Sequence, residues 1–252
     1  MLENLFILFV IYSFLGWLTE VFYAFFKHRK FVNRGFLFGP FCPIYGIGVV
    51  MASKLLFGFR SNIILLYLLS VVLASALEYL TSYILEIFFQ STWWDYSNEK
   101  YNIDGKICLK FSLLWGLACV FVVEVLNPFV VNIINLFTNL LGPYENLFLE
   151  LVLLYFCIDF VITSLSLFGF KRILFSFQNI KQKYNTEFAK LKENTQISLE
   201  DISRFKNEFA LKEENIFNKI TKNQQRLLKA FPYINSRRYK LIEEIKKRIK
   251  EF

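Results

Sequence analysis

Two runs of apolar residues are longer than any segment that a water-soluble core needs. Residues 5–26 contain one charged side chain in 22 positions, and residues 111–137 contain one in 27. The hydrocarbon core of a bilayer is about 30 Å thick, which roughly 20 residues of α-helix cross. Hydrophobic residues also make up 55% of the whole chain. We therefore predict an all-α, polytopic membrane helix bundle.

About five segments are long and apolar enough to be predicted as transmembrane helices. They are residues 5–26, 36–57, 63–89, 111–137 and 147–170. The second is the least regular, because Pro40 and Pro43 interrupt its beginning. A disrupted backbone is tolerated in a membrane only where protein or a water-filled cavity satisfies it. The second segment is therefore predicted either to cross the membrane or to enter it as a broken, re-entrant segment.

Basic residues alternate between the connections. The connections after the first and third predicted spans hold four and three Lys or Arg residues, whereas the second holds only Arg60 and the fourth none. Basic loops face the cytoplasm. We therefore expect the N-terminus outside the cell and the C-terminal tail inside.

The composition changes abruptly at residue 171, and we expect a domain boundary there. Residues 1–170 form the predicted transmembrane bundle, and residues 171–252 form the predicted cytoplasmic tail. The tail holds twenty of the 29 Lys and Arg residues. It is expected to fold on itself as a helical hairpin or to pair with a second copy as a coiled coil. Its basic end is alternatively expected to lie on the membrane surface.

The tail contains periodic signals for helices. Apolar residues recur at helical spacing over residues 173–191 and again over residues 202–227. Ser198 and Asp201 have the spacing of a capping box, which predicts the beginning of the second helix. Pro232 is expected to end that helix, and residues 237–250 to form a short basic helix.

Acidic residues inside predicted spans require an explanation, because a charge in hydrocarbon is costly. The six such residues are Glu20, Glu78, Glu86, Glu124, Glu150 and Asp159, of which Glu150 is expected to face water at the outer leaflet. Glu20 shares a stripe of its helix with small and polar residues, and Glu78 and Glu86 share a stripe of theirs. The predicted topology places these three in the cytoplasmic half. For Glu124 and Asp159, a structural and a functional interpretation remain equally open.

Loops predicted to enter the cytoplasm bring further polar groups to the same end. We expect Glu20 and Glu78 to approach each other and Arg34, so that Arg34 neutralises a carboxylate or one carboxyl group keeps a proton. The candidate site for a substrate or ion comprises Glu20, Asn33, Arg34, Tyr45, Glu78, Tyr79, Glu86, Trp94, Asp95, Tyr96 and Asn102. The alternative is that the charged residues make only contacts between helices, and that the tryptophans belong to an aromatic belt at the headgroups.

Several classes of function lack their motifs. Four scattered cysteines and the single His28 argue against a disulfide framework or a Cys/His metal site, and we expect no cofactor. No Gly-x4-Gly-Lys-Ser/Thr motif is present, so the chain does not carry its own P-loop ATPase. Nothing indicates nucleic acid as a partner. No nucleophile–base pair is recognisable, which favours a protein that is not an enzyme.

The leading interpretation is a transport or substrate-binding membrane component, and two alternatives to it remain open. One is an intramembrane or lipid-processing enzyme with Glu20, Glu78 or Asp95 as acid–base groups. The other is a membrane scaffold that recruits partners through its tail. Membrane lipids surround the protein in each case.

A series of short motifs resembles one bacterial family. The run NRGFLFGPFCPIYG at residues 33–46 is similar to the signature of the family named putative ABC-transporter permease (type IV). The other matching motifs are Gly16-Trp17 with Glu20, Glu78-Tyr79, WWDYS at residues 93–97, and Asn102, Gly105 and Cys108. The resemblance covers roughly residues 1–137.

The resemblance implies a multi-pass permease in a bacterial cell membrane that works with a separate ATPase subunit. Permeases of ABC importers usually couple to their ATPase through a cytoplasmic loop of the form EAA-x3-G-x9-I-x-LP. The chain contains no such loop.

Overall fold

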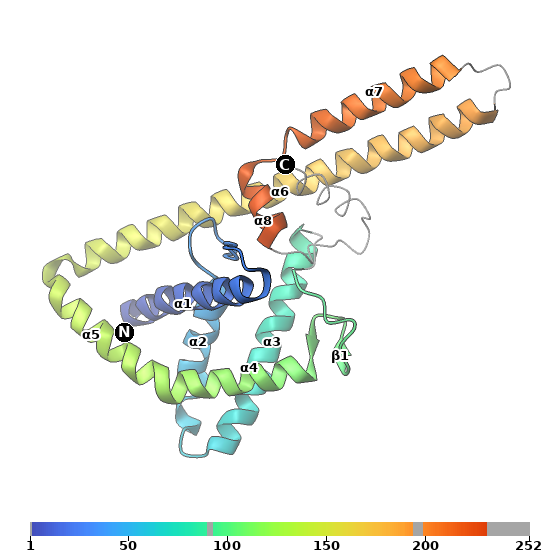
Figure 1. Ribbon diagram of the computed structural model, residues 1–252. Coiled ribbons are helices and arrows are strands. Elements are labelled where there is room, and N and C mark those ends of the chain that lie inside the picture. Colours follow the sequence, from blue (N-terminus) through green and yellow to red (C-terminus); the bar gives the residue numbers. More distant parts are fainter. Residues whose placement is uncertain (1, 90–92, 194–198, 231–252) are drawn as a thin grey trace.

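The computed structural model describes residues 2–89, 93–193 and 199–230, and helices dominate these ranges (Figure 1). The helical elements are α1 (Leu2–His28), α2 (Pro43–Leu55), η1 (Phe57–Phe59), α3 (Ile63–Phe89), α4 (Leu109–Phe121), η2 (Val122–Leu126), α5 (Asn127–Leu141), η3 (Gly142–Tyr144), α6 (Glu145–Glu193), α7 (Leu199–Phe217) and α8 (Lys222–Ala230). Strands β1 (Asn102–Ile103) and β2 (Ile107–Cys108) form a short antiparallel hairpin. Ser198, Pro232 and the predicted helix 237–250 lie outside the described residues.

Three helical segments are long and apolar enough to cross a bilayer, and the chain is a membrane protein. They are Asn4–Lys27, Ile63–Phe89 and Leu109–Ile173. Only 17% of the most apolar stretch of α3 is buried, so most of that surface is available to lipid. The third segment has 65 residues. It turns at Gly142, whose φ of 51° is left-handed, so that α5 and α6 form two arms (Figure 1).

The second predicted span is helical only in part. Residues 29–42 form an irregular loop, and α2 begins at Pro43, in the first turn, where a missing N–H costs no helical hydrogen bond. Helix α2 has 13 residues. Its length of about 20 Å is less than the roughly 30 Å of a bilayer core. The structure therefore has a short helix preceded by an irregular loop where the sequence predicted one long apolar segment.

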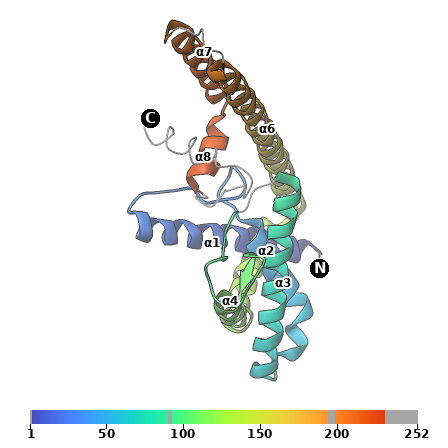
Figure 2. The same cartoon turned by 90° about the vertical axis from the view of Figure 1, so that its right-hand side faces the viewer.

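Helix α1 packs mainly on α2, and α3 packs mainly on α4. A Cβ atom at Gly16 of α1 would overlap the ring of Tyr45, and one at Gly46 of α2 would overlap Phe9. These glycines thus let the backbones of α1 and α2 approach closely, which brings Tyr45 against α1. Helix α1 runs across α3 rather than alongside it (Figures 1 and 2).

Helix α6 connects the apolar part of the chain to the polar tail without a break. It has 49 residues, and positions 170 and 171 both lie inside it. Helix α7 returns beside α6 as the second arm of a hairpin (Figure 1). The ring of Tyr184 on α6 lies 5.0 Å from that of Phe205 and 4.2 Å from that of Phe209, both on α7. The change in composition at residue 171 therefore falls inside one continuous helix.

The run 202–227, predicted as a single helix, is divided between α7 and α8. A capping box begins α8: Thr221 Oγ1 accepts a hydrogen bond from the Gln224 N–H at 3.3 Å. In return, Gln224 Oε1 accepts one from the Thr221 N–H at 2.8 Å. This reciprocal pair satisfies N–H groups that the first turn of a helix leaves without partners.

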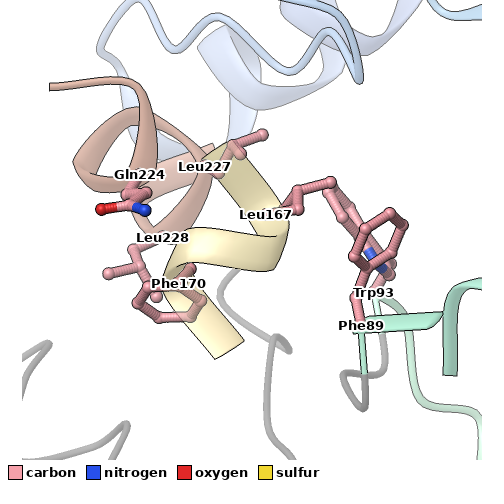
Figure 3. A pocket seen from close by; sticks show the side chains of 7 residues that line it. All are labelled: Phe89, Trp93, Leu167, Phe170, Gln224, Leu227 and Leu228. Carbon is pink, nitrogen blue, oxygen red and sulfur yellow. The ribbon is translucent and has the colours of Figure 1, made fainter. Parts of the chain in front are cut away.

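Helix α8 folds back onto α6, and Phe89 at the end of α3 lines a pocket with them from the other side of α6 (Figure 3). Leu227 and Leu228 of α8 join a buried apolar cluster with Leu167 and Phe170 of α6. Gln224 also donates a hydrogen bond from Nε2 to the carbonyl of Ser166 at 2.7 Å. The last described helix of the tail is therefore packed firmly against the apolar part of the chain.

Candidate functional site

Glu20 lies where α1, α2 and the irregular loop meet. Its Oε2 atom is 3.2 Å from Arg34 Nε, and its Oε1 atom accepts a hydrogen bond from the Tyr45 hydroxyl group at 2.7 Å. The Arg34 and Glu20 side chains are 20% and 26% exposed. The negative charge of Glu20 is therefore balanced inside the protein by one cation and one hydroxyl donor.

Glu78 on α3 has different partners and is only 8% exposed. Its Oε1 atom accepts a hydrogen bond from the Tyr96 hydroxyl group at 2.9 Å. The indole of Trp115 on α4 lies beside the same carboxyl group. The Oε2 atom is buried and has no hydrogen-bond partner among the described residues, and the same holds for Ser82 Oγ one turn along α3. Glu78 is therefore the less completely satisfied of the two acids.

An aromatic pair connects the two carboxyl groups. The rings of Tyr45 and Trp115 meet edge to face, with their centroids 5.9 Å apart. Tyr45 also binds Glu20, and Trp115 also lies beside Glu78. The structure thus assembles Arg34, Glu20, Tyr45, Trp115, Glu78 and Tyr96 into one chain of contacts across α1, α2, α3 and α4. The ion pair of Arg34 is with Glu20, and no ion pair between Arg34 and Glu78 occurs among the described residues.

Tyr96 supplies its hydrogen bond from the loop that follows α3. Burial raises the pKa of the Tyr96 hydroxyl group above its ordinary value, and the nearby Glu78 carboxyl group raises it further. The hydroxyl group therefore stays protonated near neutral pH and remains a donor to Glu78.

The hairpin of β1 and β2 covers one side of α3. Asp104 and Gly105 both have positive φ, 53° and 66°, as in the type I′ turn that suits the twist of two strands. Asn102 Oδ1 accepts a hydrogen bond from the Gly105 N–H at 3.1 Å, and Asn102 Nδ2 donates one to the Glu99 carbonyl at 2.8 Å. Asn102, a predicted site residue, thus shapes this loop.

Three other predicted site residues attach the hairpin to α3 or to its own loop. Tyr79 donates a hydrogen bond to Asp104 Oδ2 at 3.0 Å, and Glu86 Oε2 lies 2.7 Å from Lys106 Nζ. Trp94 Nε1 donates to the Lys106 carbonyl at 2.8 Å. These contacts hold the loop that carries Tyr96 in place. They therefore support the Tyr96–Glu78 hydrogen bond without touching Glu78 themselves.

The last two predicted residues stabilise loops. Asn33 Oδ1 accepts hydrogen bonds from Trp17 Nε1 at 2.8 Å and from the Gly35 N–H at 2.9 Å, which joins the irregular loop to α1. Asp95 is exposed, and its Oδ1 atom accepts a hydrogen bond from the Ser97 N–H at 2.9 Å. The structure places Asp95 at the surface, in a local turn.

Asp159 and Glu124 both have specific partners. Asp159 is 5% exposed and accepts hydrogen bonds from the Phe38 and Gly39 N–H groups, each at 2.8 Å, and from Thr163 Oγ1 at 3.1 Å. Glu124 lies in the π-helical turn η2 and receives two hydrogen bonds from Arg60, at 2.8 and 3.1 Å. Both carboxylates are thus compensated, and Asp159 joins α6 to the irregular loop.

Sequence reasoning did not single out Trp115, although it contacts both halves of the site. Ser112, Trp115, Gly116 and Cys119 recur at helical spacing, and the first and third of them are buried. Such a stripe of small residues around one tryptophan was the available signal for a contact face. Among the described residues, no three His, Cys, Asp or Glu side chains are grouped so that they could hold a metal ion.

A comparison with protein families matches residues 7–164 to the family described as putative ABC-transporter type IV. The matched range includes every residue of the candidate site and ends within α6, before the hairpin with α7. No curated protein matches the chain, and no solved structure does.

Proposed function

Since this chain belongs to the putative ABC-transporter type IV family, we propose that it is a permease-like component of a transport system in a bacterial cell membrane. Its three membrane-length apolar segments and its membership of a transport-related family support this function. The chain has no P-loop, so the proposal includes a separate ATPase subunit as the source of energy. The proposed orientation keeps the N-terminus outside and the tail in the cytoplasm.

The observation that carries the proposed binding site is the incomplete satisfaction of Glu78. A buried carboxylate without a compensating charge is costly in surroundings of low dielectric constant. Arg34 already balances Glu20, and no described cation lies within 4.0 Å of Glu78. Glu78 therefore holds a proton in the resting state and exchanges it for the cationic group of a substrate or for an ion.

The aromatic groups around Glu78 suit such a ligand. Trp115 and Tyr96 both lie at its carboxyl group. The faces of tryptophan and tyrosine rings attract cations, most strongly where water is excluded. The proposed site therefore combines one titratable carboxyl group with aromatic surfaces near the cytoplasmic ends of α1 and α3.

Affinity purification of the full chain in mild detergent, with mass spectrometry of bound proteins and small molecules, tests both parts of the proposal. We expect an ATPase and a cationic small molecule with the wild type. Glu78→Gln should lose the small molecule and keep the ATPase. Glu150→Gln changes an exposed acid of α6 in the same way and should keep both.

Different outcomes contradict different parts. Equal recovery of the small molecule with wild type and Glu78→Gln would overturn the site. Absence of an ATPase from every preparation would overturn the subunit assignment. Recovery of a chemically altered lipid or substrate that depends on Glu78 would favour the enzymatic alternative.

A further inference from the structure

We infer that Arg226, on helix α8 of the tail, is a positioning residue for the candidate site: it holds the loop that presents Arg34 to Glu20. The loop concerned is residues 33–39, called the 33–39 loop below. The link to ligand binding rests on the proposed function, whereas the link to the loop rests on geometry alone.

Arg226 binds the backbone directly after Arg34. Its Nη1 atom donates a hydrogen bond to the Gly35 carbonyl at 2.8 Å, and its Nη2 atom donates a longer one to the Phe36 carbonyl at 3.5 Å. The guanidinium group also lies 6.0 Å from the centroid of the Phe38 ring. Two carbonyl groups and one ring of the 33–39 loop are thus in contact with a residue 191 positions away from Gly35.

Asp159 binds the other end of the same loop. Its two carboxylate oxygens accept hydrogen bonds from the Phe38 and Gly39 N–H groups. The carbonyl groups at the beginning of the loop therefore face a cation, and the N–H groups at its end face an anion. Each peptide dipole is favourably oriented toward its charged partner, and charged partners give the stronger class of hydrogen bond. The conformation of the loop is set from both sides.

Helix α8 is itself fixed well enough to position Arg226. Its capping box orders the first turn, Gln224 binds the Ser166 carbonyl, and Leu227 and Leu228 pack against α6 (Figure 3). Arg226 Nε donates a further hydrogen bond to Asn223 Oδ1 at 3.0 Å, which orients the guanidinium group. Burial lowers the pKa of Arg226, and Asp159 acts in the opposite direction. Arg226 is thus a partly buried cation that donates hydrogen bonds to two carbonyl groups of the 33–39 loop and to Asn223.

The consequence is a coupling between tail and site. The family match ends at residue 164, and the signature loop lies inside the match, yet a residue at position 226 completes the support of that loop. Withdrawal of α8 removes the contacts to Gly35 and Phe36. Arg34 is then held by Glu20 without its neighbouring anchor.

Hydrogen exchange of the full chain in detergent, resolved by peptide, tests this coupling without any ligand. Arg226→Ala should accelerate amide hydrogen exchange of peptides covering the 33–39 loop by about tenfold or more. The variant loses the hydrogen bonds from a charged donor to the Gly35 and Phe36 carbonyls, so the loop should open more often and expose its N–H groups. Arg226→Lys should give a smaller increase because it retains one cationic donor. Arg204→Ala removes an exposed arginine of α7 and should leave the loop unchanged.

Cys42 provides a second, native reporter. Cys42 is 5% exposed and its Sγ atom lies 3.6 Å from the Arg34 carbonyl oxygen, whereas Cys157 is exposed. Maleimide labelling analysed by peptide mass spectrometry should rise at Cys42 in Arg226→Ala and stay constant at Cys157. Unchanged exchange and unchanged Cys42 labelling in a folded Arg226→Ala variant would overturn the inference. If Arg226→Ala unfolds globally, Arg226→Lys serves in its place. Unchanged hydrogen exchange of the 33–39 loop in Arg226→Lys would then overturn the inference.

The functional link has a separate readout. With the small molecule identified by co-purification, Arg226→Ala should weaken its binding, and Arg34→Ala/Arg226→Ala should bind no worse than Arg34→Ala alone. Additive losses in the double variant would show that Arg226 does not act through Arg34. A failure of ligand binding at Glu78 would leave the exchange result standing, so the two proposals fail separately.

Discussion

Tyr45 and Trp115 meet edge to face between Glu20 and Glu78, with their ring centroids 5.9 Å apart. Tyr45 comes from the short helix α2, and Trp115 comes from α4. Since each also contacts one acid, this pair joins the Arg34–Glu20 ion pair to the Glu78–Tyr96 hydrogen bond. A change on either side of the pair has a direct route to the other.

Tyr96→Phe should lower the free energy of unfolding by about 1–3 kcal/mol, the usual cost of leaving a buried polar group without its partner. Tyr101→Phe removes the same hydroxyl group from a side chain that is 80% exposed and should change little. Thermal unfolding of the purified variants measures the difference. Equal melting temperatures for the two variants would contradict the role given to the Tyr96 hydroxyl group.

Gly39→Ala should destabilise the chain by about 1–3 kcal/mol, the usual cost of overpacking a filled space. A Cβ atom at position 39 would overlap the Tyr155 hydroxyl group and lie 3.0 Å from Asp159 Oδ2. Gly58→Ala is the matched control, because no atom lies within 4 Å of a Cβ added there. If both alanine variants have the melting temperature of the wild type, the 33–39 loop is not packed against α6 in this way.

Glu86→Gln should cost more stability than Lys106→Met, although the two residues form one ion pair at 2.7 Å. The Lys106 side chain is 10% exposed and that of Glu86 is 38% exposed. Loss of Glu86 leaves a largely buried ammonium group, whereas loss of Lys106 leaves a carboxylate that water can reach. Denaturation of both variants gives the order, and the reverse order would refute this assignment of burial.

Single cysteines at Asn62, Asn98 and Asn146 test the proposed orientation, because all three positions are exposed. A membrane-impermeant maleimide should label positions 62 and 146 in intact cells and position 98 only after permeabilisation. Labelling of position 98 in intact cells would contradict the proposed cytoplasmic location of the loop that follows α3.

The long apolar segments were predictable because twenty successive apolar residues have few other uses. The break between α7 and α8 inside the predicted helix 202–227 could also have been predicted, since Thr221 and Gln224 have the spacing of a capping box. The contacts of Asp159 could not be predicted from the sequence. Its hydrogen bonds to Phe38 and Gly39 join positions 121 and 120 residues apart, and no local pattern in the sequence encodes such a pairing.

The same limit applies to the helix that crosses residue 171. The sequence becomes polar there, but lysine, glutamine and glutamate are good helix formers, and Gly169 alone does not end a helix that is packed on one side. Composition indicates the environment that a segment favours, whereas capping residues and prolines indicate where a helix ends. The glutamates of α1 and α3 were singled out by their cost in hydrocarbon, but their individual partners depended on how α2 and α4 are placed.

The continuity of α6 has a mechanical consequence. A helix of 49 residues is about 74 Å long. Asp159 lies near the bend at Gly142, about 20 Å from the start of this rod. If the rod tilts about that bend, a movement at its far end is reduced about threefold at Asp159, and the applied force is multiplied by the same factor. The far end of α6 is thus the end of the long arm of a lever, and the 33–39 loop is attached to the short arm.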